Sequence, residues 1–365
     1  MSLALGRLAA LLLLLPFTSA SPVPAPTRTE VAPGIYLFQT PPYGDVGLDG
    51  NSVAVVSDDG VLVFDANGTP AAARAVLAEI RKLTRQPVRY LVYSHWHWDH
   101  WYGAQVYADA FPNLVIISHA TTRALMAGPA IAFNQPGLDR QLPAHIHDIE
   151  EQLAKSRASN PPSADAAKWQ QHLDQDQFFL AQKRAARHVL ANLTFTDSLT
   201  IHLGSREIHV LHVDRAITPG DAFLYLPHEN LVVSGDLLVN PITFALFCYP
   251  RGWIRSLEWI DALDAATVIP GHGAALHDEN LLHDTLRLLR RERELGLEQR
   301  AGGQPVASAV QVISADSEIQ ALRATITQRD SARYQEFGVY LVDWFVRRVY
   351  AEAEAPLTDS IPALP

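Results

Sequence analysis

The stretch Ser94–Trp101 (SHWHWDHW) carries the most informative pattern in this chain. Four potential metal ligands lie close together in it: His95, His97, Asp99 and His100. The apolar run before it (PVRYLVY) predicts a buried strand that ends at the motif. On an extended segment, side chains two positions apart point the same way, so His95 and His97 can hold one ion while Asp99 and His100 face a second. The stretch predicts a metal site at the end of a strand.

The segments around this motif alternate between strand-like and helical patterns. Residues 34–65 contain three strand-like runs separated by turn-forming residues, and 71–83 has apolar residues at helical spacing. With the strand before His95, this makes a β-α-β unit and an α/β fold. Residues 129–190 have little strand character and predict two helices, divided at 160–163. Short strands then return, and a mostly helical tail follows from 281 to 354.

The composition limits the class of protein. The chain has 365 residues, of which 48% are hydrophobic and 19% charged, so it must bury a real core. Length alone leaves one or two domains open. The net charge of −10, without a basic run, argues against a nucleic-acid partner. The single cysteine, Cys248, excludes an internal disulfide and a thiolate metal cage.

The N-terminus predicts export. Arg7, the apolar run 8–17 and the small residues 18–20 have the order of a secretory signal peptide over residues 1–20. An uncleaved signal acting as a membrane anchor is the alternative, although the apolar run is short for a bilayer span. The proline-rich residues 21–29 predict a linker. We therefore expect a periplasmic or secreted protein with no stable membrane span after signal removal.

The pattern HxHxDH after a strand resembles the signature of the metallo-β-lactamase fold superfamily. Three later motifs resemble those of the family in the same order: Thr218–Asp221 (TPGD), Ser234–Asp236 (SGD) and Pro270–Gly273 (PGHG). The insertion and the helical tail look most like the exported quinoprotein-relay or SoxH-like subgroup. The resemblance implies an αββα sandwich of two mixed sheets over residues 30–280, with a helical insertion at about 129–190 and a helical extension at 281–354.

The resemblance also implies a ligand set. It places His95 and His97 in a first metal site, Asp99, His100 and His272 in a second, and Asp236 between the two. Imidazole and carboxylate ligands suit one or two zinc ions, and they also admit iron or manganese. Asp99 would in addition orient the water that such ions activate, which makes it the predicted catalytic residue.

One position departs from the family pattern. Where the family has a third histidine before Thr-Pro-Gly-Asp, this chain has Ile217, which offers no lone pair. A weakened first ion, a single ion in the second site, and a substitute ligand are all open outcomes. His212 and Asp214 are the nearby candidates for a substitute, but at about 3.3 Å per residue along a strand both are displaced by roughly 10 Å or more.

The identity of Asp236 favours one kind of substrate. The true β-lactamases of this fold carry cysteine or serine there, whereas relatives that resemble esterases, thioesterases and lactonases carry aspartate. We therefore expect hydrolysis of an ester, thioester, lactone or related acyl bond of a small molecule, with metal-activated hydroxide attacking the carbonyl. The alternatives are a metal- or ligand-binding protein that lost turnover with its third histidine, and an oxygen- or sulfur-handling iron protein. Nothing in the sequence sets an oligomeric state.

Other residues have both a functional and a structural interpretation. Five aromatic residues can line an apolar substrate pocket or fill the core: Trp96, Trp98, Trp101, Tyr249 and Trp253. His145 and His147 do not share a helix face, so we expect them on the surface rather than on an ion. His119 ends a strand, where core packing is the expectation.

Overall fold

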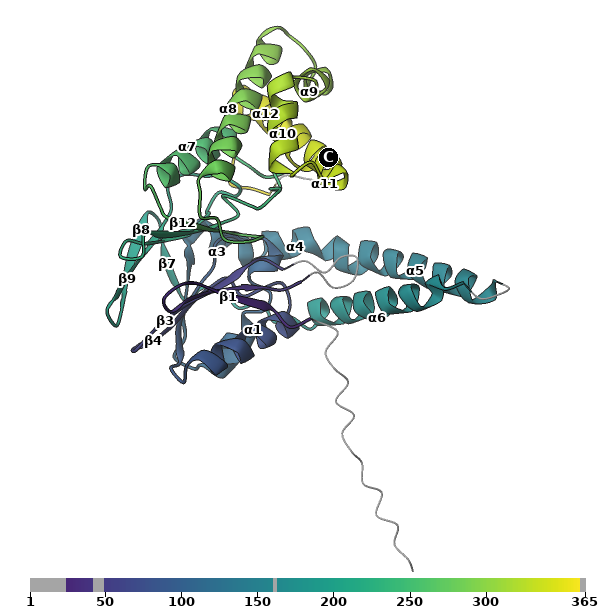
Figure 1. Cartoon of the computed structure of the whole chain (residues 1–365). Helices are drawn as coiled ribbons and strands as arrows, with labels where there is room; N and C mark the ends of the chain where they lie inside the picture. The colour runs from purple at the N-terminus through teal and green to yellow at the C-terminus, as the bar shows by residue number, and fades with distance from the viewer. Residues whose placement is uncertain (1–23, 42–48, 160–162, 362–365) are drawn as a thin grey trace, which may run out of the picture.

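The protein is a four-layer sandwich in a computed structural model that describes residues 24–41, 49–159 and 163–361 (Figure 1). The predicted signal peptide, residues 1–20, lies outside the described residues. Two sheets form the middle layers, with strand orders β1-β2-β3-β4-β5-β6-β7 and β12-β11-β10-β9-β8. The αββα architecture expected from the resemblance is confirmed.

The first sheet starts as an antiparallel meander and continues in parallel. Its strands are β1 Thr27–Ala32, β2 Ile35–Gln39, β3 Ser52–Ser57, β4 Gly60–Phe64, β5 Val88–Val92, β6 Val115–His119 and β7 Leu193–Phe195. Strands β4 to β7 pair in parallel. Thr27–Thr29, which we assigned to the linker, are in β1 and pair with Leu37–Gln39. No proline lies between Thr27 and Ala32, so every backbone N–H of β1 can join a ladder.

The second sheet has mainly antiparallel pairing. Its strands are β8 Ser198–Leu203, β9 Arg206–Leu211, β10 Phe223–Leu226, β11 Leu231–Gly235 and β12 Thr267–Pro270. Only β11 and β12 pair in parallel. Inward-facing side chains of both sheets, such as Val55, Leu62, Val210 and Leu224, form one buried apolar cluster between them. That cluster fixes the two sheets face to face.

Helices cover the outer faces. On the first sheet lie α1 Pro70–Leu83, α2 Gln105–Ala110 and α3 Ala120–Met126, and on the second lies α7 Pro250–Asp261. Helix α1 begins at the cap Thr69, whose side chain accepts from the backbone N–H of Ala72. Its buried face packs with the outer face of β4 and β5 in a second apolar cluster.

The insertion forms a helical hairpin that projects from the sandwich (Figure 1). It contains α4 Pro129–Pro136, a π-helical turn Gly137–Gln141, α5 Leu142–Ala158 and α6 Asp165–Arg184. The sequence predicts two helices here, and the structure adds the shorter α4. The long helices α5 and α6 pack on each other through a small apolar cluster that includes Ile149 and Leu173.

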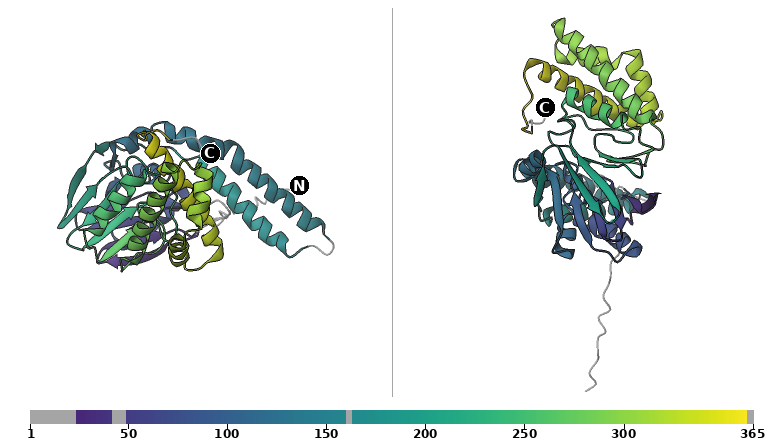
Figure 2. Two further views of the ribbon diagram at one scale, coloured as in Figure 1. Left: turned by 90° about the horizontal axis from the view of Figure 1, so that it is seen from above. Right: turned by 90° about the vertical axis from the view of Figure 1, so that its left-hand side faces the viewer.

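The tail forms a helical layer on α7 at the far side of the second sheet (Figure 2). Its helices are α8 Asn280–Ala301, α9 Val306–Ser314, α10 Ser317–Ile326, α11 Ser331–Phe337, a π-helical turn Gly338–Asp343 and α12 Trp344–Glu354. Trp253 of α7 and Phe345 of α12 meet in the apolar cluster that joins this layer to the sheet. The extension therefore shares its core with the sandwich.

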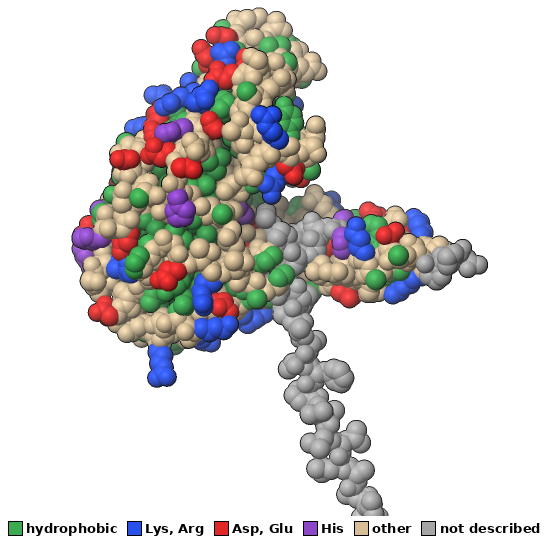
Figure 3. Space-filling model, viewed as in Figure 1, with side chains coloured by type: hydrophobic (Ala, Val, Ile, Leu, Met, Phe, Trp, Pro, Cys, Tyr) green, Lys and Arg blue, Asp and Glu red, His purple; other side chains and the backbone are tan. Residues whose placement is uncertain are grey.

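The surface shows no segregation of charge on the face drawn in Figure 3, where Lys and Arg lie among Asp and Glu. Within the described part of the chain, no helix has both the length and the apolar character that crossing a membrane requires.

Candidate metal centre

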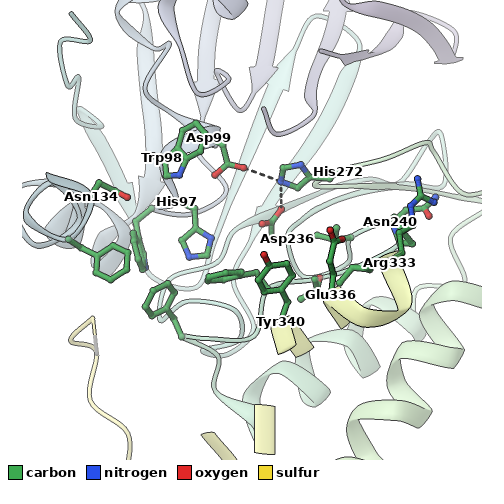
Figure 4. Close-up of a pocket in the computed structure, with 18 residues that line it drawn as sticks. His97, Trp98, Asp99, Asn134, Asp236, Asn240, His272, Arg333, Glu336 and Tyr340 are labelled. Atoms are coloured by element: carbon green, nitrogen blue, oxygen red, sulfur yellow. Dashed lines mark ion pairs between the residues drawn. The ribbon is translucent and has the colours of Figure 1, made fainter. Parts of the chain in front are cut away.

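The six side chains named from the sequence come together at one end of the two sheets. Figure 4 shows His97, Asp99, Asp236 and His272 of this set. His95 and His97 follow β5, and a short 3₁₀-helix, Trp98–His100, presents the next pair. Asp236 follows β11 and His272 follows β12 in the opposite sheet. The centre thus lies between the sheets, where the strand ends of both converge.

The ligand atoms form two groups. One contains His95, His97 and Asp236, and the other contains Asp99, His100 and His272; within each group the atoms lie within 4.8 Å of one another. Asp236 also links the groups, because its Oδ2 is 3.5 Å from His95 Nε2 and its Oδ1 is 3.3 Å from His100 Nε2. This is the grouping that the family resemblance implies.

The donor set fits a cation. Four buried ligand atoms have no hydrogen-bond partner among the described residues: His95 Nε2, His97 Nε2, His100 Nε2 and Asp236 Oδ1. Leaving buried polar atoms unpaired costs about 1–3 kcal/mol each. Atoms that converge and lack partners are satisfied together by a metal ion, and nitrogen with carboxylate oxygen is a set that zinc accepts.

The electrostatics of the two groups differ. Burial lowers the pKa of His95 well below its ordinary value and that of His97 to about 4, so both imidazoles are neutral. Burial by itself also lowers the pKa of His100, but the carboxylates Asp236 and Asp99 outweigh it and raise that pKa well above the ordinary value. The pKa of His272 is raised for the same reason. An ion in the second group must therefore displace protons.

Supporting hydrogen bonds orient the histidines. The Nδ1 of His100 is 2.7 Å from Asp65 Oδ2, and Asp65 also accepts from the backbone N–H and the hydroxyl of Ser94. That hydroxyl oxygen is 2.8 Å from His95 Nδ1. Partners of this kind fix which ring nitrogen faces the ion. Asp65 and Ser94 belong to the site. The sequence pattern did not indicate Asp65, which follows β4 in the left-handed conformation and lies far in sequence from the motif 95–100.

The loop that carries His272 is tied to the first sheet. The backbone N–H of Asn51 donates to Gly271 O at 2.7 Å, and its Nδ2 donates to Pro270 O and Gly273 O, both at 2.8 Å. Gly271 is required here, since a Cβ would lie 2.0 Å from Asp236 Oδ1. The final ligand is thus positioned by residues from both sheets.

Neither candidate substitute for the missing histidine joins the groups. Ile217 is fully buried in the apolar cluster that contains α7 and α8. His212 Nδ1 bonds Asp221 O at 2.8 Å and its ring stacks on His119. Asp214 pairs with Arg255 at 3.0 Å. Among the described residues, the first group has three protein ligands rather than four.

A pocket of about 510 Å³ opens onto the centre. Its apolar wall contains Trp96, Trp98, Phe133, Ile242, Phe244 and Phe247. Arg333, Glu336 and Tyr340, from α11 and the following π-turn, form the opposite side; Figure 4 shows Glu336 and Tyr340 reaching toward Asp236. No sequence pattern indicates these three residues, because their contribution depends on how the tail folds back over the sheet.

The remaining aromatic candidates have structural contacts. Trp96 and Trp98 line the pocket, as one of the two interpretations had it. Trp101 and Trp253 are buried, and their Nε1 groups donate to backbone carbonyls at 2.9 Å. Tyr249 donates to Thr358 O at 2.7 Å and does not line the pocket. Two of the five therefore line the pocket.

The other titratable candidates lie away from the centre. His147 is exposed beside Glu150 and Glu151, whereas His145 lies 3.4 Å from Asp176 between the hairpin helices. His119 caps α3 and bonds Thr196 O, as a residue of the core periphery. Burial raises the pKa of the Cys248 thiol, which leaves it protonated.

The fold, the two ligand groups and the comparisons define one family. A model of the metallo-beta-lactamase superfamily matches residues 45–272, which is more than half of the chain and includes all six side chains. The chain belongs to the metallo-beta-lactamase superfamily. The exported subgroup named from the sequence stays a prediction.

One curated relative and several solved structures resemble the chain at low sequence identity. A linear primary-alkylsulfatase from a Pseudomonas species is 21% identical over 253 residues, which cover 65% of this chain and 44% of that protein. The chain thus spans less than half the length of this curated relative. A metallo-beta-lactamase from Pontibacter korlensis superimposes with a TM-score of 0.51 at 16% identity, covering 73% of this chain and 99% of that one. A metallo-beta-lactamase from Pseudomonas aeruginosa, solved in a mono-zinc form, gives 0.51 at 13% identity, covering 74% and 97%. These structures support the fold.

Proposed function

We propose that the chain is an exported metal-dependent hydrolase that cleaves an ester, thioester, lactone or related acyl bond at the six-residue centre. The observation that carries this proposal is the convergence of six side chains, with four unpartnered buried ligand atoms, at the end of an apolar pocket. Family membership supports the class of reaction, and Asp236 in the linking position supports the acyl substrate.

The chain's own residues have defined roles in this proposal. His95, His97 and Asp236 would hold one ion, and Asp99, His100 and His272 would hold the other. Zinc at this place supplies Lewis-acid polarisation and a lowered pKa for bound water. The carboxylate of Asp99 orients the attacking water, since its pKa is held well below the ordinary range by His100 and His272 despite burial. The water oxygen bonds to the carbonyl carbon, the C–O or C–S bond breaks, and the leaving group departs with a proton from that water.

The pocket supports a substrate with an apolar body. Phe133, Phe244 and Phe247 pack edge to face or at a tilt near His97, which leaves an aromatic surface beside the ligand groups. Aromatic walls with few polar groups are typical of small-molecule sites. A sulfate ester is a second candidate, because the alkylsulfatase relative is named for one and an alkyl chain would suit the same wall.

A substrate panel with metal control tests the proposal. Purified protein loaded with zinc, iron or manganese is assayed on short esters, thioesters, lactones and an alkyl sulfate, with and without a chelator. We expect acyl hydrolysis that chelation abolishes and zinc restores. Activity that chelation leaves unchanged would overturn the metal mechanism, and cleavage of the alkyl sulfate alone would favour the second candidate.

The same preparation separates the two other hypotheses. Tight metal or ligand binding without turnover on any substrate would support a binding protein that lost catalysis through Ile217. Iron as the metal retained from cells, with no hydrolysis, would support oxygen or sulfur chemistry. Export is tested by expressing the full chain and sequencing the N-terminus of periplasmic material; cleavage after Ala20 is the expected result.

A further inference from the structure

A second cavity lies beside the metal-centre pocket, beneath the helical hairpin. It has a volume of about 590 Å³ and is bounded by α4, the π-turn after it, α5 and α6. Trp98, Phe133 and Asn134 line both cavities, so the two share one wall. A ligand held at the metal centre therefore has a neighbouring space for any part that extends past these residues.

The lining of this second cavity is mainly apolar, with two basic side chains, Lys183 and His145, of which His145 lies 3.4 Å from Asp176. Pro136, Leu138, Leu142 and Phe179 contribute apolar surface. Lys183 belongs to α6, and its side chain is turned inward and is only 5% exposed. Its position is unusual, because lysine is almost never fully buried unless it is paired.

The ammonium group is surrounded by rings. Lys183 Nζ lies 3.2 Å from the ring centroid of Trp98, 4.3 Å from that of Tyr102 and 5.7 Å from that of Phe179. Among the described residues it has no ion pair or hydrogen bond with any side chain or carbonyl, and it lines open space in the cavity. Ring faces attract a cation, but they do not satisfy all three hydrogen-bond donors of an ammonium group.

The electrostatics leave this lysine short of an anion. Burial lowers its pKa well below the ordinary value, and the charges of Asp99 and Asp49 offset that only in part. A charge buried without a partner is costly, and a charge-assisted hydrogen bond is the strong way to satisfy it. A ligand that brings a carboxylate or sulfate into the cavity would supply that bond.

We infer that this cavity binds the far, anionic end of an elongated amphipathic substrate, with Lys183 as its anchor and the scissile bond at the metal centre. The inference rests on the proposed function for the position of the scissile bond. The apolar lining would accommodate the alkyl chain between the two ends of the substrate. This alkyl chain would pass beside Phe133 and Asn134, which line both cavities. The substrate class is an ester with a medium-length apolar chain that ends in an anion.

Matched esters test the inference. The kcat/KM of monoethyl decanedioate, which carries a distal carboxylate, is compared with that of ethyl decanoate, which ends in a methyl group. We expect the wild type to prefer the carboxylate by about tenfold or more, the range of a charge-assisted bond. Lys183→Met should reduce that preference to about one, while Lys183→Arg keeps part of it. Lys168→Met, an exposed lysine on the same helix, is the control and should leave the ratio unchanged.

Two further measurements keep the test decisive. Ala132→Trp narrows the cavity from its exposed rim without touching Lys183, so it should lower the preference even where Lys183→Met fails to fold. Calorimetric binding of decanedioate to the metal-loaded protein does not require turnover, and Lys183→Met should weaken it by about tenfold or more.

The outcomes distinguish the two proposals. A carboxylate preference unchanged in Lys183→Met and Ala132→Trp would overturn the distal site, leaving Lys183 as a packing partner of Trp98. Loss of all ester turnover in the wild type, with decanedioate binding still dependent on Lys183, would instead overturn the hydrolase and keep the site. An equal loss on both esters in Lys183→Met would also contradict the inference.

Discussion

The two ligand groups use the same residue types but differ in what surrounds them. Each group has one carboxylate, but Asp236 of the first group also lies 3.3 Å from His100 and 3.6 Å from His272 of the second, and His100 is hydrogen-bonded directly to buried Asp65. In the first group the ring centroid of His97 lies 5.6 Å from that of Phe247. Ile217, where the sequence analysis expected a third histidine, is buried in an apolar cluster. Divalent ions bind where negative charge and orienting hydrogen bonds are most abundant. We therefore expect the second group to fill first and the first group to be weak.

The largest effect should come from the residue that belongs to both groups. Asp236→Ala removes the carboxylate that lies near His95, His100 and His272, so both ions should be lost together. Turnover should fall by more than the roughly 100-fold typical of supporting residues. Metal content by mass spectrometry and kcat/KM report the two effects. Asp214→Ala, an aspartate in an exposed ion pair, is the control. An Asp236→Ala protein that keeps two ions would contradict the linking role.

The next effect separates the groups. His272→Ala should empty the tight second site, whereas His97→Ala should lose only the weak first ion and keep the second. Titration of the apoprotein with zinc, followed by equilibrium dialysis, should show the larger loss of affinity for His272→Ala. Equal losses in the two variants would mean that the groups are equivalent and that Ile217 has no consequence for occupancy.

The support of the second group can be tested through Asp65. Asp65→Asn keeps the shape of the side chain but removes the charge that faces His100 Nδ1. We expect a loss of about 10- to 100-fold in zinc affinity at the second group and a smaller loss at the first, because Asp65 contacts His100 directly and reaches His95 only through the Ser94 hydroxyl. Ser52→Ala is a matched control, because its hydroxyl donates to the backbone carbonyl of Asp65 rather than to a ligand. Unchanged affinity in Asp65→Asn would remove the explanation offered for the difference between the groups.

The smallest effect is expected where the chain departs from its family. Ile217→His places an imidazole in a fully buried apolar position, which costs about 1–3 kcal/mol of unfolding free energy unless the ring reaches an ion. If it does, zinc content should rise toward two ions per chain and turnover should rise with it. Ile217→Leu controls for repacking. Thermal unfolding without zinc measures the cost of burying the imidazole, and unfolding with zinc measures the stabilisation that a bound ion supplies. Should neither metal content nor turnover rise, the isoleucine is an adaptation and not damage.

The sequence was most informative where ligands follow strands directly. The motif 95–100 predicted four of the six side chains of the centre from its own pattern, and His272 in the later PGHG turn came from the family resemblance. Asp236 came from the family resemblance at the same kind of position. Arg333, Glu336 and Lys183 could not be predicted, since they reach the cavities from helices whose packing depends on distant residues. The local sequence pattern therefore predicted the candidate metal ligands, whereas the residues that line the cavities depend on the tertiary fold.

The three hydrogen bonds of Asn51 have a consequence for how the protein comes apart. Asn51 directly precedes β3 of the first sheet and holds the loop after β12, the last strand of the second sheet. The two sheets therefore cannot move apart without withdrawing His272 from its partners. Melting of the sandwich and release of zinc should then be a single cooperative event.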